Sequence, residues 1–198
     1  RVRLNSTHLA AVHGCTAQAF FALMVTLCVL TGRDWVAAGT PRPDPDHLRR
    51  RGLVTLVLVY GQIVAGALLR HFGAALTVHA VLAVAVWGHA AMLVWRIERR
   101  RGEVPELVPS ARALAATVSL QVALGVVAWW MLRPFDGVPR AVTGPQALVR
   151  TAHLANGALL LASAVILTLR SFRHLAPEAR GASPGLSAQA PWDLETVA

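Results

Sequence analysis

Three histidines stand near the beginning of long apolar segments: His13, His79 and His153. These segments are the first, third and fifth of five, so they cross a membrane in the same direction and hold their histidines at one depth. An imidazole is costly in hydrocarbon unless its nitrogens find a partner, and ionisable residues within a membrane are candidates for function. Heme iron accepts axial histidine nitrogens. The sequence therefore predicts a buried heme near one face of a bilayer.

His79 and His153 are the predicted axial ligands of this heme. In a sequential up-down bundle of the last four segments, the segments that carry these two histidines are diagonal. Neighbouring helix axes lie about 8–10 Å apart, so the diagonal is roughly 13 Å, which suits a porphyrin held edge-on between two imidazoles. The alternative is that both histidines hydrogen-bond to neighbouring helices. His13 lies outside the four-helix unit, and for it the two interpretations, iron ligand and hydrogen-bonded core histidine, are equally open.

Other polar residues fall at or below the same depth. Arg70, His71 and Arg150 lie at a height where they could contact heme propionates, and for the pair Arg70 and His71 the alternative is that they snorkel to the interface. His89 lies about 15 Å deeper than His79 along the same helix, and we expect it to hydrogen-bond to another helix.

A weak internal repeat links a Gln-x-x-x-Gly segment to the histidine helix that follows it. Gln62–Gly66 precedes His79, and Gln121–Gly125 precedes His153. We expect the glutamines to form interhelical hydrogen bonds, worth about 1 kcal/mol each, and the glycines to permit close helix approach on the same face. His13 has no such partner before it, as expected for a protein entered partway through.

Several other kinds of site are excluded by the residue pattern. The sequence contains no Ser-His-Asp set, phosphate-binding loop, zinc-ligand spacing or pair of membrane carboxylates. Cys15 and Cys28 are about 20 Å apart along one helix, too far for a disulfide, and are interpreted as small buried hydrophobes.

The composition indicates a membrane protein. Of the 198 residues, 55% are hydrophobic and only 15% are charged, and the mean hydropathy is +0.51. About 20 apolar residues cross a bilayer. We expect an all-α integral membrane protein with five transmembrane helices, the last four forming the up-down heme-binding bundle. The predicted spans are Leu9–Thr31, Leu53–Arg70, Ala74–Trp95, Ala111–Leu132 and Leu148–Leu169.

Arginines set the expected orientation and exclude one class of partner. The net charge is +9 and every basic residue is arginine, 13 of them flanking one side of the predicted spans and six the other. The richer side is predicted to be cytoplasmic, with the N-terminus outside and the C-terminus inside a bacterial plasma membrane. No basic face with aromatic platforms accompanies the charge, so we expect no nucleic-acid partner.

The chain divides into four expected parts. Residues 1–32 contain the first helix, and residues 33–51 form a cytoplasmic loop rich in proline and aspartate. Residues 52–172 form the four-helix bundle. Residues 173–198 turn to proline, glycine and serine, and we expect a disordered cytoplasmic tail.

Taken together, the residues around His13, His79 and His153, with the segments Gln62–His71 and Gln121–Gly125, resemble the heme A synthase family of cytochrome oxidase assembly. Members have eight membrane helices in two pseudo-repeated bundles. Residues 1 to about 172 resemble the last five helices, so residues 1–32 would hold the last helix of the N-terminal catalytic bundle.

This resemblance implies oxidation of a heme O methyl to the formyl group of heme A, with membrane lipid, heme O synthase or terminal oxidase subunits as partners. His79 and His153 resemble the ligands of the heme b in the C-terminal bundle. His13 resembles one histidine of the bundle that processes substrate heme. Ala80 departs from the family, in which arginine often follows the third-helix histidine. The catalytic residues would precede residue 1.

Two other functions fit the same sequence. One is a membrane b-type cytochrome or heme-binding module without its own catalysis. A two-heme version of it would need a second histidine pair at inner depth, where only His89 lies. The other is a helical scaffold without a cofactor, in which the histidines are packed polar groups.

Overall fold

The computed structural model describes residues 6–73, 75–132 and 141–177, and these are almost entirely helical. Five long helices account for most of them: α1 (Thr7–Leu30), α3 (Leu48–Phe72), α4 (Leu76–Arg99), α5 (Val108–Leu132) and α6 (Gly144–His174). Each is long and apolar enough to cross a membrane. The prediction of five helices that are long and apolar enough to span a membrane is confirmed for the residues that the structure describes.

Local signals in the sequence begin and end these helices. Asp44 is buried and its carboxylate accepts from the backbone N–H groups of Leu48 at 2.7 Å and Arg49 at 3.2 Å, which caps the start of α3. Gly73 takes the left-handed conformation that ends the same helix. Thr143 and Gln146 form a reciprocal capping box at the start of α6.

The helices are longer than the predicted spans, chiefly at one end. α3 begins at Leu48 rather than Leu53, and α4 and α6 continue to Arg99 and His174. Hydropathy identifies only the part of a helix that suits hydrocarbon. The helical backbone continues through the arginines because their side chains can reach water while the backbone hydrogen bonds continue.

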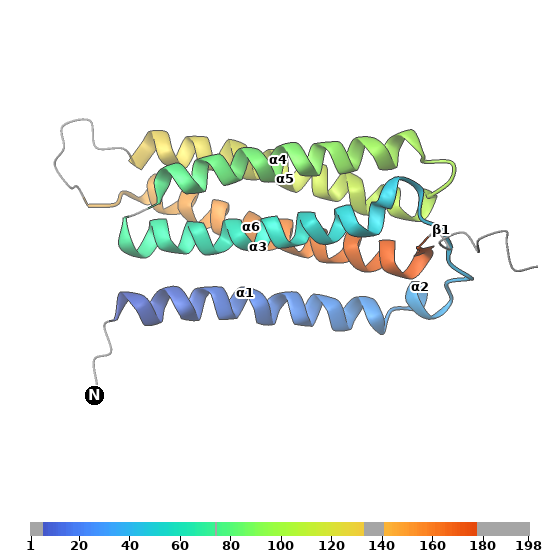
Figure 1. Cartoon of the computed structure of the whole chain (residues 1–198). Coiled ribbons are helices and arrows are strands. Elements are labelled where there is room, and N and C mark those ends of the chain that lie inside the picture. The colour runs from blue at the N-terminus through green and yellow to red at the C-terminus, as the bar shows by residue number, and fades with distance from the viewer. Residues whose placement is uncertain (1–5, 74, 133–140, 178–198) are drawn as a thin grey trace, which may run out of the picture.

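Four of the helices surround one core. α3 packs against α4 and α6, and α5 packs against the same two helices, so α4 and α6 are each flanked by α3 and α5. α1 contacts α3 and α6, and it lies on the side away from α4 and α5 (Figure 1). The N-terminal ends of α1, α4 and α6 lie at one end of the molecule (Figure 1). We call this the histidine end and the opposite end the arginine end.

The arginine end is closed by short elements and ion pairs. The connection from α1 to α3 contains α2 (Arg33–Val36), β1 (Arg42–Pro43) and η1 (Pro45–His47), and η2 (Pro105–Leu107) precedes α5. β1 pairs in parallel with β2 (Leu175–Ala176) directly after α6. Asp46 forms ion pairs with Arg96 and Arg100, and Glu106 forms one with Arg42.

This closure changes the predicted boundary of the tail. We expected residues 173–198 to be disordered, whereas α6 includes residue 173 and Leu175 is only 1% exposed. The sequence gives no local signal for β2, because its hydrogen bonds go to a strand more than 130 residues earlier. The rest of the predicted tail, from residue 178, lies outside the described residues.

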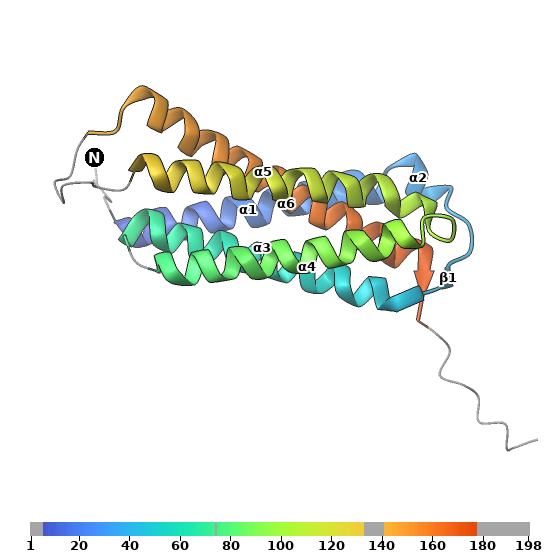
Figure 2. The same cartoon turned by 90° about the horizontal axis from the view of Figure 1, so that it is seen from above.

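Burial is concentrated at the arginine end. Large side chains such as Leu93, Ile97, Leu107, Leu114 and Leu167 are at most 1% exposed there. At the histidine end, residues 76–85, 119–131 and 144–155 include no buried residue in the described chain, and α3 contributes only Ala65 beyond Val59. The first turns of α6 lean away from the neighbouring helices at this end (Figure 2).

Candidate functional site

His79 lies in the first turn of α4 and contacts Gln62 of α3. The Gln62 amide nitrogen is 3.3 Å from His79 Nε2 and also donates to the backbone carbonyl of His79 at 3.0 Å. Gly66 lies one turn further along α3. A Cβ atom at Gly66 would be 3.2 Å from His79 Cε1, so this glycine leaves the space that the imidazole occupies.

His153 occupies the corresponding position between α5 and α6. The Gln121 amide nitrogen is 3.2 Å from His153 Nε2. A Cβ atom at Gly125 would be 3.2 Å from His153 Cε1. The same three residue types therefore meet in the same way in both helix pairs. This is the spatial form of the repeat found in the sequence.

A second amide fixes the orientation of Gln121. Asn156 donates from Nδ2 to the Thr117 carbonyl at 2.9 Å and to Gln121 Oε1 at 2.7 Å. Since Gln121 Oε1 accepts from Asn156, the NH2 group of Gln121 must face His153. In the α3–α4 pair, the position equivalent to Asn156 is Leu82, and Gln62 Oε1 is buried without a hydrogen-bond partner among the described residues.

These contacts determine which nitrogen of each ring carries the lone pair. An amide NH2 group can only donate, so Nε2 of His79 and of His153 must accept, and the proton of each neutral imidazole is on Nδ1. Both Nδ1 atoms are buried and have no hydrogen-bond partner in the described chain. Each ring thus holds one weakly engaged lone pair at Nε2, which is the kind of atom that ligates a metal.

The two histidine sites belong to one region of the molecule. α4, which carries His79, and α6, which carries His153, share the neighbours α3 and α5. Each histidine is half-buried, as are both glutamines and both glycines of the repeat.

The other predicted site residues are not held in this constellation. His13 is exposed on α1, Arg70 is exposed, and His71 and Arg150 are half-buried. With the residues that the structure describes, these four side chains form no hydrogen bond or ion pair. Their predicted roles toward a heme therefore depend on their height along the helices alone.

His89 has the role expected of it. Its Nε2 lies 3.2 Å from the Arg51 carbonyl oxygen, which links α4 to α3. Among the described residues no group of three His, Cys, Asp or Glu side chains could hold a bare metal ion. A heme differs from such an ion because the protein supplies only its axial ligands.

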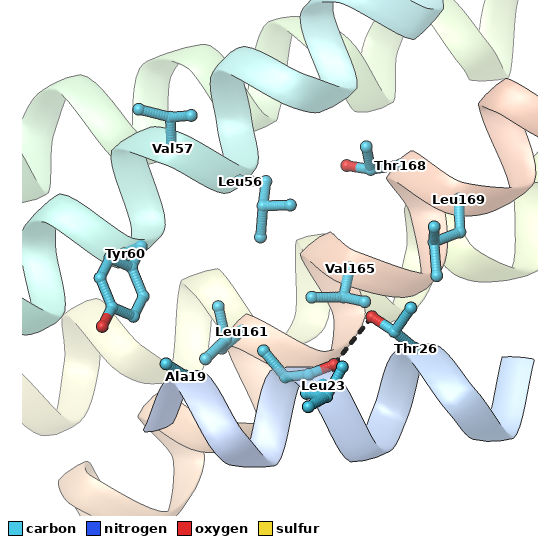
Figure 3. Close-up of a pocket in the computed structure, with 11 residues that line it drawn as sticks. Ala19, Leu23, Thr26, Leu56, Val57, Tyr60, Leu161, Val165, Thr168 and Leu169 are labelled. Atoms are coloured by element: carbon cyan, nitrogen blue, oxygen red, sulfur yellow. Dashed lines mark hydrogen bonds between the residues drawn. The ribbon is translucent and has the colours of Figure 1, made fainter. Parts of the chain in front are cut away.

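A separate apolar groove of about 420 Å³ lies between α1, α3 and α6 (Figure 3). Its polar groups are three hydroxyls, and all of them already donate: Thr26 to the Ala22 carbonyl at 2.8 Å, Tyr60 to the Cys15 carbonyl at 3.1 Å and Thr168 to the Ala164 carbonyl at 2.7 Å. No titratable side chain other than Tyr60 lines it. The groove suits helix packing or lipid rather than catalysis.

No protein family, curated protein or solved structure matches the chain. The site must therefore be interpreted from its own geometry.

Both histidines, glutamines and glycines are unusual in the sequence, but the sequence does not predict the contacts between them. The glycines were expected to allow helix backbones to approach, whereas each accommodates an imidazole. Asn156 was not predicted, although its position three residues after His153 places both on one face of α6.

Proposed function

We propose that this protein binds a b-type heme at the histidine end of the α3–α6 bundle, with His79 and His153 as axial ligands. The observation that carries the proposal is the duplicated contact of a glutamine amide, an imidazole and a glycine on two helix pairs. A single histidine bonded to a glutamine is ordinary packing. Two such histidines, on the two helices that share the same neighbours, supply the pair of ligands that a heme iron needs.

The residues present fit a heme by two observations. First, each imidazole has a lone pair at Nε2 that is held only by a neutral amide, and an Nδ1 atom that is buried without a partner. Second, the residues at the histidine end that face neighbouring helices are only half-buried, whereas the arginine end is closed by large side chains.

The chain's own residues have distinct roles in this proposal. Gly66 and Gly125 leave space for the rings, and Gln62 and Gln121 hold the Nε2 atoms of the rings in the heme-free protein. The apolar helices exclude water, and the core at the arginine end keeps the four helices together. When bound, heme supplies one-electron chemistry. The up-down arrangement of the four helices, which this proposal requires, is supported by the shared neighbours of α4 and α6.

We further propose that this unit is the C-terminal heme b bundle of a heme A synthase-like protein, which oxidises the heme O methyl to a formyl group. This step rests on the resemblance of the sequence motifs. α1 would then be the last helix of the catalytic bundle and His13 a ligand of substrate heme. The exposure of His13 on α1 is compatible with a site completed by other helices. Heme O synthase and terminal oxidase subunits are the proposed partners.

The proposed orientation places the arginine end in the cytoplasm of a bacterium and the histidine end outside. The arginines of the α1–α3 and α4–α5 connections and of the end of α6 support it, because cytoplasmic loops carry an excess of arginine and lysine.

The alternative is a membrane b-type cytochrome or heme-binding module without its own catalysis. The bonding of His89 to the Arg51 carbonyl favours a single heme in either case, because a second heme at the arginine end would need a free histidine pair there. The two candidates share the heme site and differ only in whether heme O is oxidised.

Absorbance spectroscopy of the full chain, purified in detergent and reconstituted with hemin, tests the heme site. We expect a low-spin b-type spectrum at one heme per chain. His79→Ala and His153→Ala should each abolish the low-spin bands, while His8→Ala, at the exposed start of α1, should leave them unchanged. A protein that binds no hemin would instead be a scaffold in which the histidines only pack, and a low-spin spectrum kept in both ligand variants would assign the iron to other ligands.

A further inference from the structure

A second groove, of about 610 Å³, lies between α1 and α6 at the arginine end. Its walls are apolar and include Phe21, Met24, Val25 and Ile166. Its inner end is polar and includes Arg33, Asp34, Arg170 and His174. The groove is thus amphipathic along its length: it is apolar between the helices and charged where α1 ends and α2 begins.

The length of the apolar part matches one leaflet of a bilayer. From Phe21 to Leu30, where α1 ends, the helix rises about 14 Å at 1.5 Å per residue. Half the hydrocarbon core of a bilayer is about 15 Å. An acyl chain lying along α1 would therefore end near the membrane centre when its headgroup is level with Arg33.

The charges at the inner end favour an anionic headgroup. Arg33 makes no ion pair with the residues that the structure describes. Arg170 is paired with Asp34 at 3.3 Å, but the Asp34 side chain is 87% exposed, so water screens this pair. Arg170 also donates to the Glu106 carbonyl and to the Ser110 hydroxyl, both at 3.4 Å, which holds its guanidinium in place.

The side chains around the inner end of the groove also carry a net positive charge. The charged side chains that face this end from the packed elements are four arginines and two acids: Arg33, Arg42, Arg170, Arg173, Asp34 and Glu106. Arg173 donates to the backbone carbonyls of Trp35 at 2.9 Å, Gly39 at 3.2 Å and Ala38. It thereby fixes the segment after α1 that forms the inner rim, where Trp35 lies as interfacial tryptophans do.

We propose that this groove binds one anionic phospholipid, with its phosphate near Arg33 and Arg170 and one acyl chain between α1 and α6. Such a lipid would fill the space between α1 and the bundle where the two helices are not in close contact. In the proposed orientation this end faces the cytoplasmic leaflet, where basic pockets between helices recognise anionic headgroups. The inference does not depend on heme binding.

Native mass spectrometry of the full chain tests the site. The protein is exchanged into detergent with equal amounts of phosphatidylglycerol and phosphatidylcholine of identical acyl chains. We expect one retained phosphatidylglycerol per chain in preference to phosphatidylcholine. Each interfacial cation contributes about 1 kcal/mol toward an anionic lipid surface, so Arg33→Gln should reduce the preference about fivefold. Arg99→Gln, which removes an arginine at the same depth on α4, is the matched control.

A second variant tests the apolar part. Cys28→Phe should fill the groove and lower retention of both lipids, without changing the preference for phosphatidylglycerol among the lipid that remains. Equal retention of the two lipids by the unmodified chain would overturn the proposal. So would an equal loss of preference in Arg33→Gln and Arg99→Gln, because that result would indicate a general charge effect and not a site.

Discussion

The NH2 group of Gln121 lies 3.2 Å from Nε2 of His153, and it is held there because Asn156 donates to the other end of the same amide. This chain of contacts begins at the Thr117 carbonyl and ends at the imidazole lone pair. It joins α5 to α6 at the point where large buried side chains give way to half-buried ones. The orientation of His153 thus depends on Asn156, a residue that hydrogen-bonds to Gln121 and not to His153.

Asn156→Leu should therefore weaken the α5–α6 contact and release Gln121. The substitution reproduces the residue that α4 has at the equivalent position, Leu82. We expect a loss of about 1 kcal/mol in the free energy of unfolding, the scale of an interhelical hydrogen bond in membranes. Chemical unfolding in mixed micelles measures this loss. The ¹⁵N chemical shifts of the imidazole should also show His153 losing its fixed tautomer while His79 keeps its own.

If Asn156→Leu lowered the free energy of unfolding but left the His153 tautomer unchanged, other contacts would orient Gln121. The control is Ser163→Ala, also in α6, whose hydroxyl donates only to the Leu159 carbonyl of its own helix. This change should alter neither the stability by more than a few tenths of a kcal/mol nor the His153 spectrum.

The two glycines of the repeat give a second prediction. A Cβ atom at Gly66 or Gly125 would lie 3.2 Å from a histidine Cε1 atom, so alanine requires the imidazole to move by a few tenths of an ångström. Overpacking of this kind costs about 1–3 kcal/mol. We expect Gly66→Ala and Gly125→Ala to shift the histidine resonances and to weaken hemin binding by tenfold or more, as measured by absorbance titration.

Gly88 is the matched control, since a Cβ atom there would meet nothing within 4 Å. In the middle of α4, Gly88→Ala should raise stability by up to about 1 kcal/mol and leave hemin binding unchanged. If all three glycine variants behaved alike, the contact with imidazole would not be the reason for glycine at positions 66 and 125.

The sequence predicted the five helices because length and hydropathy decide what can cross a bilayer. The contacts at the site depend on something else, the rotation of each helix about its axis. α3 and α5 are apolar on nearly all sides, so their residue pattern does not reveal which face meets the neighbouring helix. The pairing of Gln62 with His79 was therefore beyond a sequence argument, even though both residues had been selected as unusual.

The arginine end was unpredictable for a related reason. β1 and β2 contain two residues each, and their pairing joins positions that are distant in the chain. The buried cap of α3 by Asp44 is a local motif, but the surrounding proline and aspartate residues concealed it as ordinary loop composition. In both cases tertiary contacts, and not local preference, determine the conformation.

Asp44 provides a third prediction. Its carboxylate accepts from two backbone N–H groups of α3 and its own N–H donates to the Ala176 carbonyl at 2.9 Å. Asp44→Ala should cost about 1–2 kcal/mol of unfolding free energy, because it removes a buried carboxylate that accepts from the first two N–H groups of α3, as an N-cap side chain does. Ser6→Ala removes the more exposed and longer cap of α1, at 3.4 Å, and should cost about 0.5 kcal/mol. Equal losses of unfolding free energy in the two variants would show that burial does not strengthen the Asp44 cap.

The last prediction concerns what the glutamines do when heme is added, and it rests on the proposed function. Each amide holds the Nε2 lone pair that an iron would take, so amide and iron compete for one atom. Gln121→Leu removes a hydrogen bond worth about 1 kcal/mol from the heme-free protein alone. The affinity for hemin should therefore rise about fivefold in this variant, and likewise in Gln62→Leu. Equilibrium titration measures the affinity, with His153→Ala as the variant that cannot bind. A fall in affinity would instead show that the glutamines act in the heme-bound protein, where they would orient the ligating rings.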